Sequence, residues 1–321
     1  MVTICTAISV TAGDHYFGRN LDYEHTFGEK IVITPRNYPF KELKHHYAII
    51  GMALPYEGYP LYFDATNEVG LSMAGLNFPG FAEYQGEIEG KKNLPSFALI
   101  PWILGSCKTV EEAAGKIAEL NITKEAFSET MPPTPLHWLI ADQYRAITLE
   151  QTKEGLRVFE NPIGVLTNSP SFDIQLFHLH NYLSVTAKEP QNQFAEELFL
   201  KPYSRGMGGM GLPGDFSSMS RFVRAAFFKG NAVYERSEEA VVSQFFHILS
   251  GVAQIKGCVK VENLYEMTNY TSCCNTARGI YYYTTYFNQR IYAVDMHRED
   301  LSGDSIIVYD LVENEKIPIQ N

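Results

Sequence analysis

A cysteine, an arginine and an aspartate lie close together near the start of the chain, in a pattern that suits a nucleophile. Cys5 stands in the β-prone run 3–10, and an Ala-Gly-Asp turn separates it from a second run, 15–18, that leads directly to Arg19 and Asp22. Two short strands joined by a tight turn form a hairpin, whose open ends lie side by side. We therefore expect the Cys5 thiol beside the Arg19 guanidinium, which favours the thiolate that a cysteine nucleophile needs. A small buried hydrophobic residue, the commoner role of free cysteine, is the alternative.

Two asparagines close apolar strands in similar surroundings. Asn77 precedes Phe-Pro-Gly, and Asn168 precedes Ser-Pro. Side-chain amides at such positions can donate hydrogen bonds to the oxyanion of an acyl-transfer intermediate. They can equally cap the turns that follow, and the pattern alone does not separate the two roles.

Arg221 lies in the first turn of a predicted helix that Ser217 or Ser218 can cap. A cation there opposes the helix dipole, which indicates either an anionic partner or simple solvent exposure. His137 stands in an apolar strand without a partner at metal-ligand spacing, so we expect a core or hydrogen-bonded histidine. The glycine-rich stretch 203–215 lacks a phosphate-binding motif and is interpreted as a surface loop at the edge of a site.

Composition indicates a globular protein with a large core. The chain has 321 residues, 45% of them hydrophobic, and no linker divides it, so we expect one domain over residues 1–321. The net charge of −11 without a basic cluster argues against nucleic-acid binding. Five cysteines without CxxC spacing indicate a reduced, cytoplasmic protein with no structural metal. We find no signal peptide and no apolar run long enough for a membrane span.

The order of the elements predicts sheets covered by helices. Strand-like segments occupy both ends of the chain, and helical patterns lie between them. The predicted helices cover residues 96–107, 109–120, 172–184, 219–230 and 237–255.

Several stretches together resemble the choloylglycine hydrolase family, which includes conjugated bile acid hydrolases and penicillin V acylases among the N-terminal nucleophile hydrolases. The matching stretches span nearly the whole chain in family order: CTAI at 5–8, FGRNLDYE at 17–24, NEVGLSMAGLNFPG at 67–80, NPIGVLTNSP at 161–170, GLPGDFSSMSRFVRAAF at 211–227 and YTSCC at 270–274. Together they are highly specific, although no single one would be.

The resemblance implies an α+β fold, a four-layer αββα sandwich of two antiparallel sheets flanked by helices. It also implies amide hydrolysis without a cofactor or metal, in which the freed α-amine of Cys5 is the general base. An unperturbed α-amine has a pKa near 7.7–8.0, close to working pH. The site residues that the resemblance carries over are Cys5 as nucleophile, Arg19 and Asp22 beside it, Asn77 and Asn168 at the oxyanion positions, and Arg221.

The resemblance favours a bile salt hydrolase that cleaves glycine or taurine from a steroid acyl group. A penicillin V acylase and an unprocessed, inactive amphiphile-binding homologue are the alternatives. Tyr23, Phe63 and Phe78 suit the acyl pocket of either enzyme, and Arg205 could meet a taurine sulfonate. The family also implies a homotetramer.

The start of the chain departs from the family pattern. In bile acid hydrolases the nucleophile commonly follows the initiator methionine, but here Val2, Thr3 and Ile4 intervene. Cys5 then has no free α-amine until these residues are removed. We expect residues 1–4 to be a short leader, and the alternative is extra sequence in front of the natural start.

Overall fold

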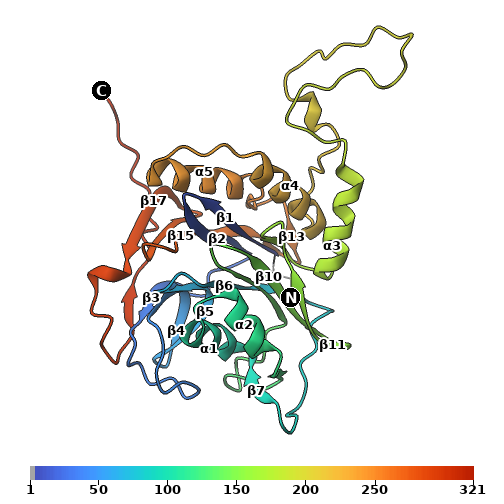
Figure 1. Cartoon of the computed structure of the whole chain (residues 1–321). Coiled ribbons are helices and arrows are strands. Elements are labelled where there is room, and N and C mark those ends of the chain that lie inside the picture. The colour runs from blue at the N-terminus through green and yellow to red at the C-terminus, as the bar shows by residue number, and fades with distance from the viewer. Residues whose placement is uncertain (1–3) are drawn as a thin grey trace.

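A computed structural model of the chain describes residues 4–321, and two large sheets that face each other form its centre (Figure 1). The predicted leader therefore lies outside the described residues except for Ile4. The first sheet has the order β12 (Val165–Leu166), β1 (Ile4–Ala12), β2 (Asp14–Tyr23), β15 (Met267–Asn275), β16 (Ile280–Thr285) and β17 (Asn288–Asp295). The second has the order β11 (Gly155–Glu160), β10 (Ala146–Thr152), β9 (Leu136–Ala141), β6 (Ser72–Asn77), β5 (Tyr59–Asn67), β4 (Ile49–Tyr56), β3 (Lys30–Thr34) and β18 (Ile307–Tyr309).

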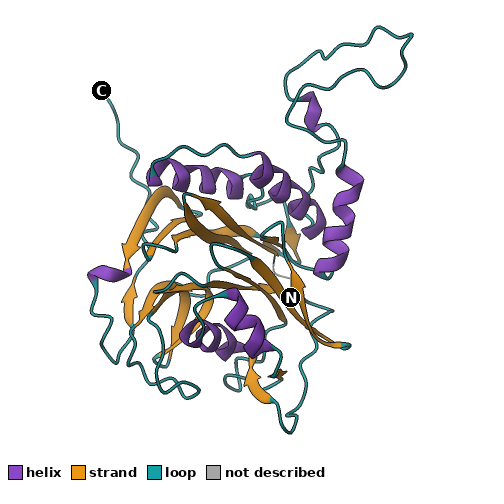
Figure 2. Ribbon diagram, in the orientation of Figure 1, coloured by secondary structure: helices purple, strands orange, loops and turns teal. Residues whose placement is uncertain are grey.

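Helices cover the outer face of each sheet (Figure 2). The first sheet packs against α4 (Ser218–Asn231) and α5 (Glu238–Ser250), and the second against α1 (Leu99–Ser106) and α2 (Val110–Ile117). One buried cluster fills the space between the sheets and under α4 and α5, and a second fills the space under α1 and α2. The predicted four-layer αββα sandwich is confirmed.

The smaller elements lie at the edges of these layers. They are α3 (Phe172–His178), the parallel pair β7 (Lys92–Pro95) and β8 (Leu120–Thr123), the hairpin β13 (Lys260–Val261) and β14 (Leu264–Tyr265), and short 3₁₀ helices at Ser96–Ala98, Leu179–Tyr182, Met207–Gly209 and Met296–Arg298.

The predicted hairpin at the start of the chain is present, and its register sets the site. In β1 and β2, Ile4 lies opposite Asp22, Cys5 opposite Leu21, and Ala7 opposite Arg19. The turn residue Gly13 has a φ of +76°, which glycine adopts without strain. Because side chains alternate along a strand, Cys5 and Arg19 face the second sheet while Asp22 faces the helices.

A long arm, residues 183–214, connects α3 to α4 and projects away from both sheets (Figure 1). Its side chains include large apolar residues that are more than four-fifths exposed: Leu183, Phe194, Phe199 and Tyr203. The sequence predicted a surface loop here, and the structure places it far from the space between the sheets. None of the helices among residues 4–321 is both long and apolar enough to cross a bilayer.

Candidate active site

A largely apolar cavity of about 510 Å³ lies between the sheets, with Cys5 and Arg19 in its wall. A volume of this size falls within the range of small-molecule sites. Much of the wall is aromatic or aliphatic and includes Tyr23, Phe27, Leu61, Phe63, Phe97, Ile100, Phe127 and Leu136. The cavity therefore presents one thiol to an apolar ligand.

The backbone of Cys5 is held on both sides by polar side chains. Its N–H donates to Oδ1 of Asn168 over 2.7 Å, and its carbonyl oxygen accepts from Nη1 of Arg221. Burial raises the pKa of the Cys5 thiol, although Arg19 acts in the opposite direction. Arg19 therefore favours the thiolate, as its position predicted, but in the chain with Ile4 attached desolvation has the larger effect on the pKa of Cys5.

Arg19 is fully buried, and its hydrogen bonds go to backbone carbonyls. Nη1 donates to the carbonyl oxygens of Phe63 (3.2 Å) and Gly75, and Nε donates to that of Asn20 (3.3 Å). Burial acts to lower its pKa, but Cys5 and nearby acidic groups outweigh it and raise the value above the ordinary range. The guanidinium therefore stays charged and is locked in one position beside the cavity.

Asp22 lies on the helix-facing side of β2, next to the Cys5 backbone. Its Oδ1 accepts from the Thr268 hydroxyl over 2.5 Å, whereas Oδ2 is buried with no hydrogen-bond partner among residues 4–321. Burial raises the pKa of Asp22 to about 6, while Arg221, Thr268 and Arg19 limit the rise. A buried carboxylate oxygen without a donor is a place where a cation can bind.

Asn168 connects the other groups of the site. Its Oδ1 accepts from the Cys5 N–H and from Nη2 of Arg221, both at 2.7 Å, and its Nδ2 donates to the Asn77 carbonyl oxygen over 2.8 Å. An amide nitrogen carries two hydrogens, so one donor of Asn168 is used in this way. Asn77, at the end of β6, lines the cavity.

The predicted first-turn arginine of α4 has oxygen partners rather than solvent. Arg221 is fully buried and donates to Cys5, Asn168, the Thr6 hydroxyl (2.7 Å) and the Phe216 carbonyl (3.0 Å). Burial lowers its pKa to about 10, so the guanidinium is charged at neutral pH. Its charge lies near Asp22, which fits the anionic neighbour that the sequence indicated.

A profile of the linear amide C–N hydrolases of the choloylglycine hydrolase family matches residues 5–309. The chain belongs to this family. Among its relatives, the bile salt hydrolase/transferase of Lactiplantibacillus plantarum is 51% identical over 314 residues, covering 96% of this chain and 97% of that protein. The bile salt hydrolase/transferase of Clostridium perfringens is 40% identical over 317 residues, covering 95% and 96%.

Solved structures of the choloylglycine hydrolase family share this architecture. A cysteine-to-alanine variant of the conjugated bile acid hydrolase from Clostridium perfringens matches with a TM-score of 0.92 at 38% identity, over 99% of this chain and 100% of that one. Penicillin V acylase from Agrobacterium tumefaciens matches with a TM-score of 0.74 at 20% identity, over 97% and 92%. The second likeness concerns the fold alone.

Two of the four predicted substrate-binding residues do not reach the cavity. Tyr23 and Phe63 line it, but Phe78 is fully buried and stacks on His137 with ring centroids 4.2 Å apart. Phe78 lies just beyond the end of β6, and its ring packs on His137 instead of reaching the cavity. Arg205 is exposed on the arm, which carries it away from the cavity of its own chain (Figure 1).

Sequence reasoning missed several buried polar residues around the site. Asp64 accepts from the hydroxyls of Tyr270 and Tyr281, both at 2.7 Å, and from Ser272 at 3.1 Å, close to Arg19. Glu266 is buried near Asp22, and burial raises its pKa to about 8. Within residues 4–321, no group of three or more His, Cys, Asp or Glu side chains is arranged to hold a metal ion.

Proposed function

We propose that this chain hydrolyses the amide bond between a steroid acyl group and glycine or taurine. The observation that carries the proposal is the apolar cavity with the Cys5 thiol in its wall. The names of its relatives, bile salt hydrolase/transferase and conjugated bile acid hydrolase, support the same substrate class. An apolar cavity of this size suits a bulky hydrocarbon acyl group, and the amide then lies at the thiol.

The catalytic base is the α-amine of Cys5, freed by cleavage of the Ile4–Cys5 peptide bond. The nitrogen already lies against Oδ1 of Asn168. The free oxygen of Asp22 faces the same region and can accept from the ammonium form, which orients the amine. Base and nucleophile then belong to one residue, and the backbone fixes their separation.

The reaction proceeds through a thioester. The amine takes the thiol proton as Sγ attacks the amide carbon, and donors from Asn77 and the second hydrogen of Asn168 stabilise the oxyanion. The ammonium then returns the proton to the departing amine of glycine or taurine. Water, deprotonated by the same amine, hydrolyses the thioester and regenerates the thiol. An amine in place of this water would give acyl transfer, as the relatives' names indicate for them.

The purified protein is expected to begin at Cys5. Only the cleaved chain has the amine base, so intact mass and N-terminal sequencing should show loss of residues 1–4 in active preparations. A preparation that keeps Ile4 and still hydrolyses its substrates at normal rates would contradict the proposed base. Retention of Ile4 without turnover would instead support an inactive, amphiphile-binding homologue.

Conjugated bile acids are expected to be better substrates than penicillin V. The measurement is kcat/KM for glycocholate, taurocholate and penicillin V on one preparation. We expect both bile acid conjugates to exceed penicillin V at least tenfold, because the acyl cavity is large and apolar. A higher kcat/KM for penicillin V would favour penicillin V acylase, the alternative function.

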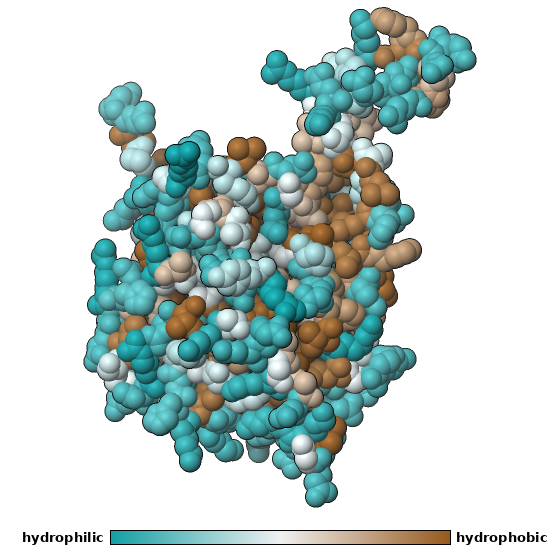
Figure 3. Space-filling view, viewed as in Figure 1, coloured by the Kyte–Doolittle hydropathy of each residue, from teal (hydrophilic) through white to brown (hydrophobic). Residues whose placement is uncertain are grey.

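The arm supports the predicted homotetramer. Figure 3 shows apolar side chains on the arm and on the adjoining face over α3, and the exposed residues there include Phe177, Leu183, Phe194 and Phe199. Exposed apolar surface of this kind is typical of protein interfaces. We further propose a cytoplasmic location, which suits the five free cysteines.

Replacing Phe194 and Phe199 together by glutamate is expected to shift the protein from tetramer to smaller species. Light scattering coupled to size exclusion measures the mass. Phe287→Glu, at another exposed phenylalanine outside the arm, is the matched control and should leave the mass unchanged. An unchanged mass in the double variant would contradict a role for the arm in assembly.

A further inference from the structure

We propose that His137 is a positioning residue that holds Asn77 and Asn168 in place for the reaction. This inference rests on the proposed function for its kinetic part. His137 lies in β9 of the second sheet and is fully buried. It touches neither the cavity nor Cys5, so any effect on catalysis must pass through other residues.

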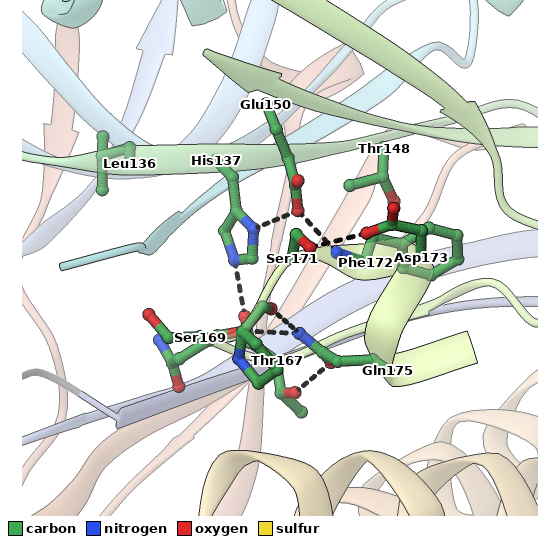
Figure 4. Close-up of polar contacts among 12 residues, drawn as sticks. Leu136, His137, Thr148, Glu150, Thr167, Ser169, Ser171, Phe172, Asp173 and Gln175 are labelled. Atoms are coloured by element: carbon green, nitrogen blue, oxygen red, sulfur yellow. Dashed lines mark hydrogen bonds and ion pairs between the residues drawn. The ribbon is translucent and has the colours of Figure 1, made fainter. Parts of the chain in front are cut away.

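The first contact fixes the segment that carries Asn168. Nε2 of His137 lies 2.8 Å from the carbonyl oxygen of Thr167, the residue directly before Asn168 (Figure 4). A carbonyl oxygen can only accept, so Nε2 carries a hydrogen and donates it. The bond joins the second sheet to the end of β12 on the first sheet, across the plane between the layers.

The second contact fixes the segment that carries Asn77. The ring of Phe78, the residue directly after Asn77, stacks on the imidazole with an interplanar angle of 8°. The Phe78 N–H also donates to the Pro135 carbonyl over 2.7 Å. The histidine therefore contacts a sequence neighbour of each asparagine, and Asn168 Nδ2 joins the two asparagines through the Asn77 carbonyl oxygen.

Glu150 holds the histidine in this orientation. Nδ1 of His137 lies 3.2 Å from Oε1 of Glu150, and the same oxygen accepts from the Phe172 N–H over 2.9 Å (Figure 4). A single proton lies between Nδ1 of His137 and Oε1 of Glu150 and makes this contact a hydrogen bond. The histidine and the glutamate together therefore add no net charge to the core. A buried pair of this kind fixes geometry more than it adds stability.

Gln175, in α3, also stiffens the turn of residues 167–170 that carries Asn168. Its Nε2 donates to the carbonyl oxygens of Asn168 (2.5 Å) and Pro170 (2.6 Å), and its Oε1 accepts from the Thr167 hydroxyl over 2.7 Å. The turn is tied to the second sheet at His137 and, through the Asn168 side chain, at Asn77, and it is tied to α3 at Gln175. Without His137, the turn keeps its fold, but only the Asn168 side chain itself then holds it against Asn77.

The test compares His137→Gln with His15→Gln. His15 is also buried and bonded on both ring nitrogens, to Ser9 and Thr276, but it lies at the far end of β2. We expect His137→Gln to lower kcat by about 10–100-fold with KM changed less than threefold, because a small misplacement of donors affects the transition state while the acyl cavity is intact. His15→Gln should leave kcat within about twofold.

A double variant tests whether the effect passes through the asparagine. In an Asn168→Ala background, His137→Gln should lower kcat by a clearly smaller factor than it does in the wild type, because one of its two targets is gone. A full 10–100-fold loss in that background, or an equal loss of kcat in His15→Gln, would overturn the proposal. Glu150→Gln should lower kcat by a smaller factor than His137→Gln does. It replaces His137→Gln as the test variant if His137→Gln does not fold.

Hydrogen–deuterium exchange tests the proposal without any substrate. His137→Gln should speed amide exchange in residues 76–80 and 165–170 while leaving exchange in β1 and β2 unchanged. Faster exchange confined to those segments supports the positioning role even if conjugated bile acids are not substrates. Unchanged exchange there would overturn the proposal whatever the activity.

Discussion

Replacing Cys5 by alanine is expected to lower kcat for amide hydrolysis by a factor on the order of 10⁵, with the fold intact. The thiol supplies the atom that forms the acyl-enzyme, and loss of a nucleophile costs rates of this size in comparable enzymes. Cys5→Ala should also keep Ile4 attached, because the thiol is the group placed to attack that bond. Activity against glycocholate and intact mass are the measurements.

Cys107→Ala is the matched control for this variant. Cys107 is also a fully buried free cysteine, but it lies at the end of α1, under the other face of the second sheet. It should keep kcat within about twofold of the wild type. If Cys5→Ala retained more than about one per cent of wild-type kcat, Cys5 would not be the nucleophile.

Features set by neighbouring residues could be predicted from the sequence. The hairpin of β1 and β2 and its glycine turn are local, and so are the helix caps. Thr109, Ser217 and Ser237 each accept a backbone N–H at the start of α2, α4 and α5, the position where serine and threonine are preferred, and Ser217 is one of the two caps that we expected for α4. The layered fold also followed from the family resemblance.

Features set by strand register could not be predicted. Thr268 meets Asp22 because β15 pairs with β2, although 246 residues separate the two in sequence. The hydroxyls of Tyr270 and Tyr281 reach Asp64 on the opposite sheet for the same kind of reason. The net pKa shift at Cys5 could not be predicted either, since its largest cause, desolvation, depends on the packing of the whole core.

A cation added beside Asp22 would stabilise the site. Oδ1 of Asn168 accepts from the Cys5 N–H and from Nη2 of Arg221, and Asp22 leaves one buried oxygen without a donor among residues 4–321. A buried, unpaired carboxylate lowers the free energy of unfolding. Release of an α-ammonium at Cys5 would supply the missing positive partner, so processing should both activate and stabilise the protein.

Asp22→Asn is the second variant with a large expected effect, and its activity and stability should change in opposite directions. In the processed enzyme it should lower kcat by about 10³-fold, because the neutral amide does not orient the ammonium. Stability is measured in the unprocessed Cys5→Ala background. There, burial raises the pKa of Asp22 to about 6, above its ordinary value of 3.8.

Between pH 4 and pH 6 the folded Cys5→Ala protein thus keeps a proton on Asp22 that the unfolded chain has released, so the free energy of unfolding falls as pH rises. Above pH 6 this loss amounts to about 3 kcal/mol. Asp22→Asn removes this loss. In urea unfolding, the free energy of unfolding of the variant should therefore rise above that of its Cys5→Ala parent between pH 4 and pH 7, by about 3 kcal/mol at the upper end. Because Asp22 contributes to the raised pKa of Glu266, both proteins also carry Glu266→Gln, and the difference then reports Asp22. The exposed Asp304→Asn should show no such pH-dependent gain, and a flat difference for Asp22→Asn would contradict a buried, unpaired carboxylate beside Cys5.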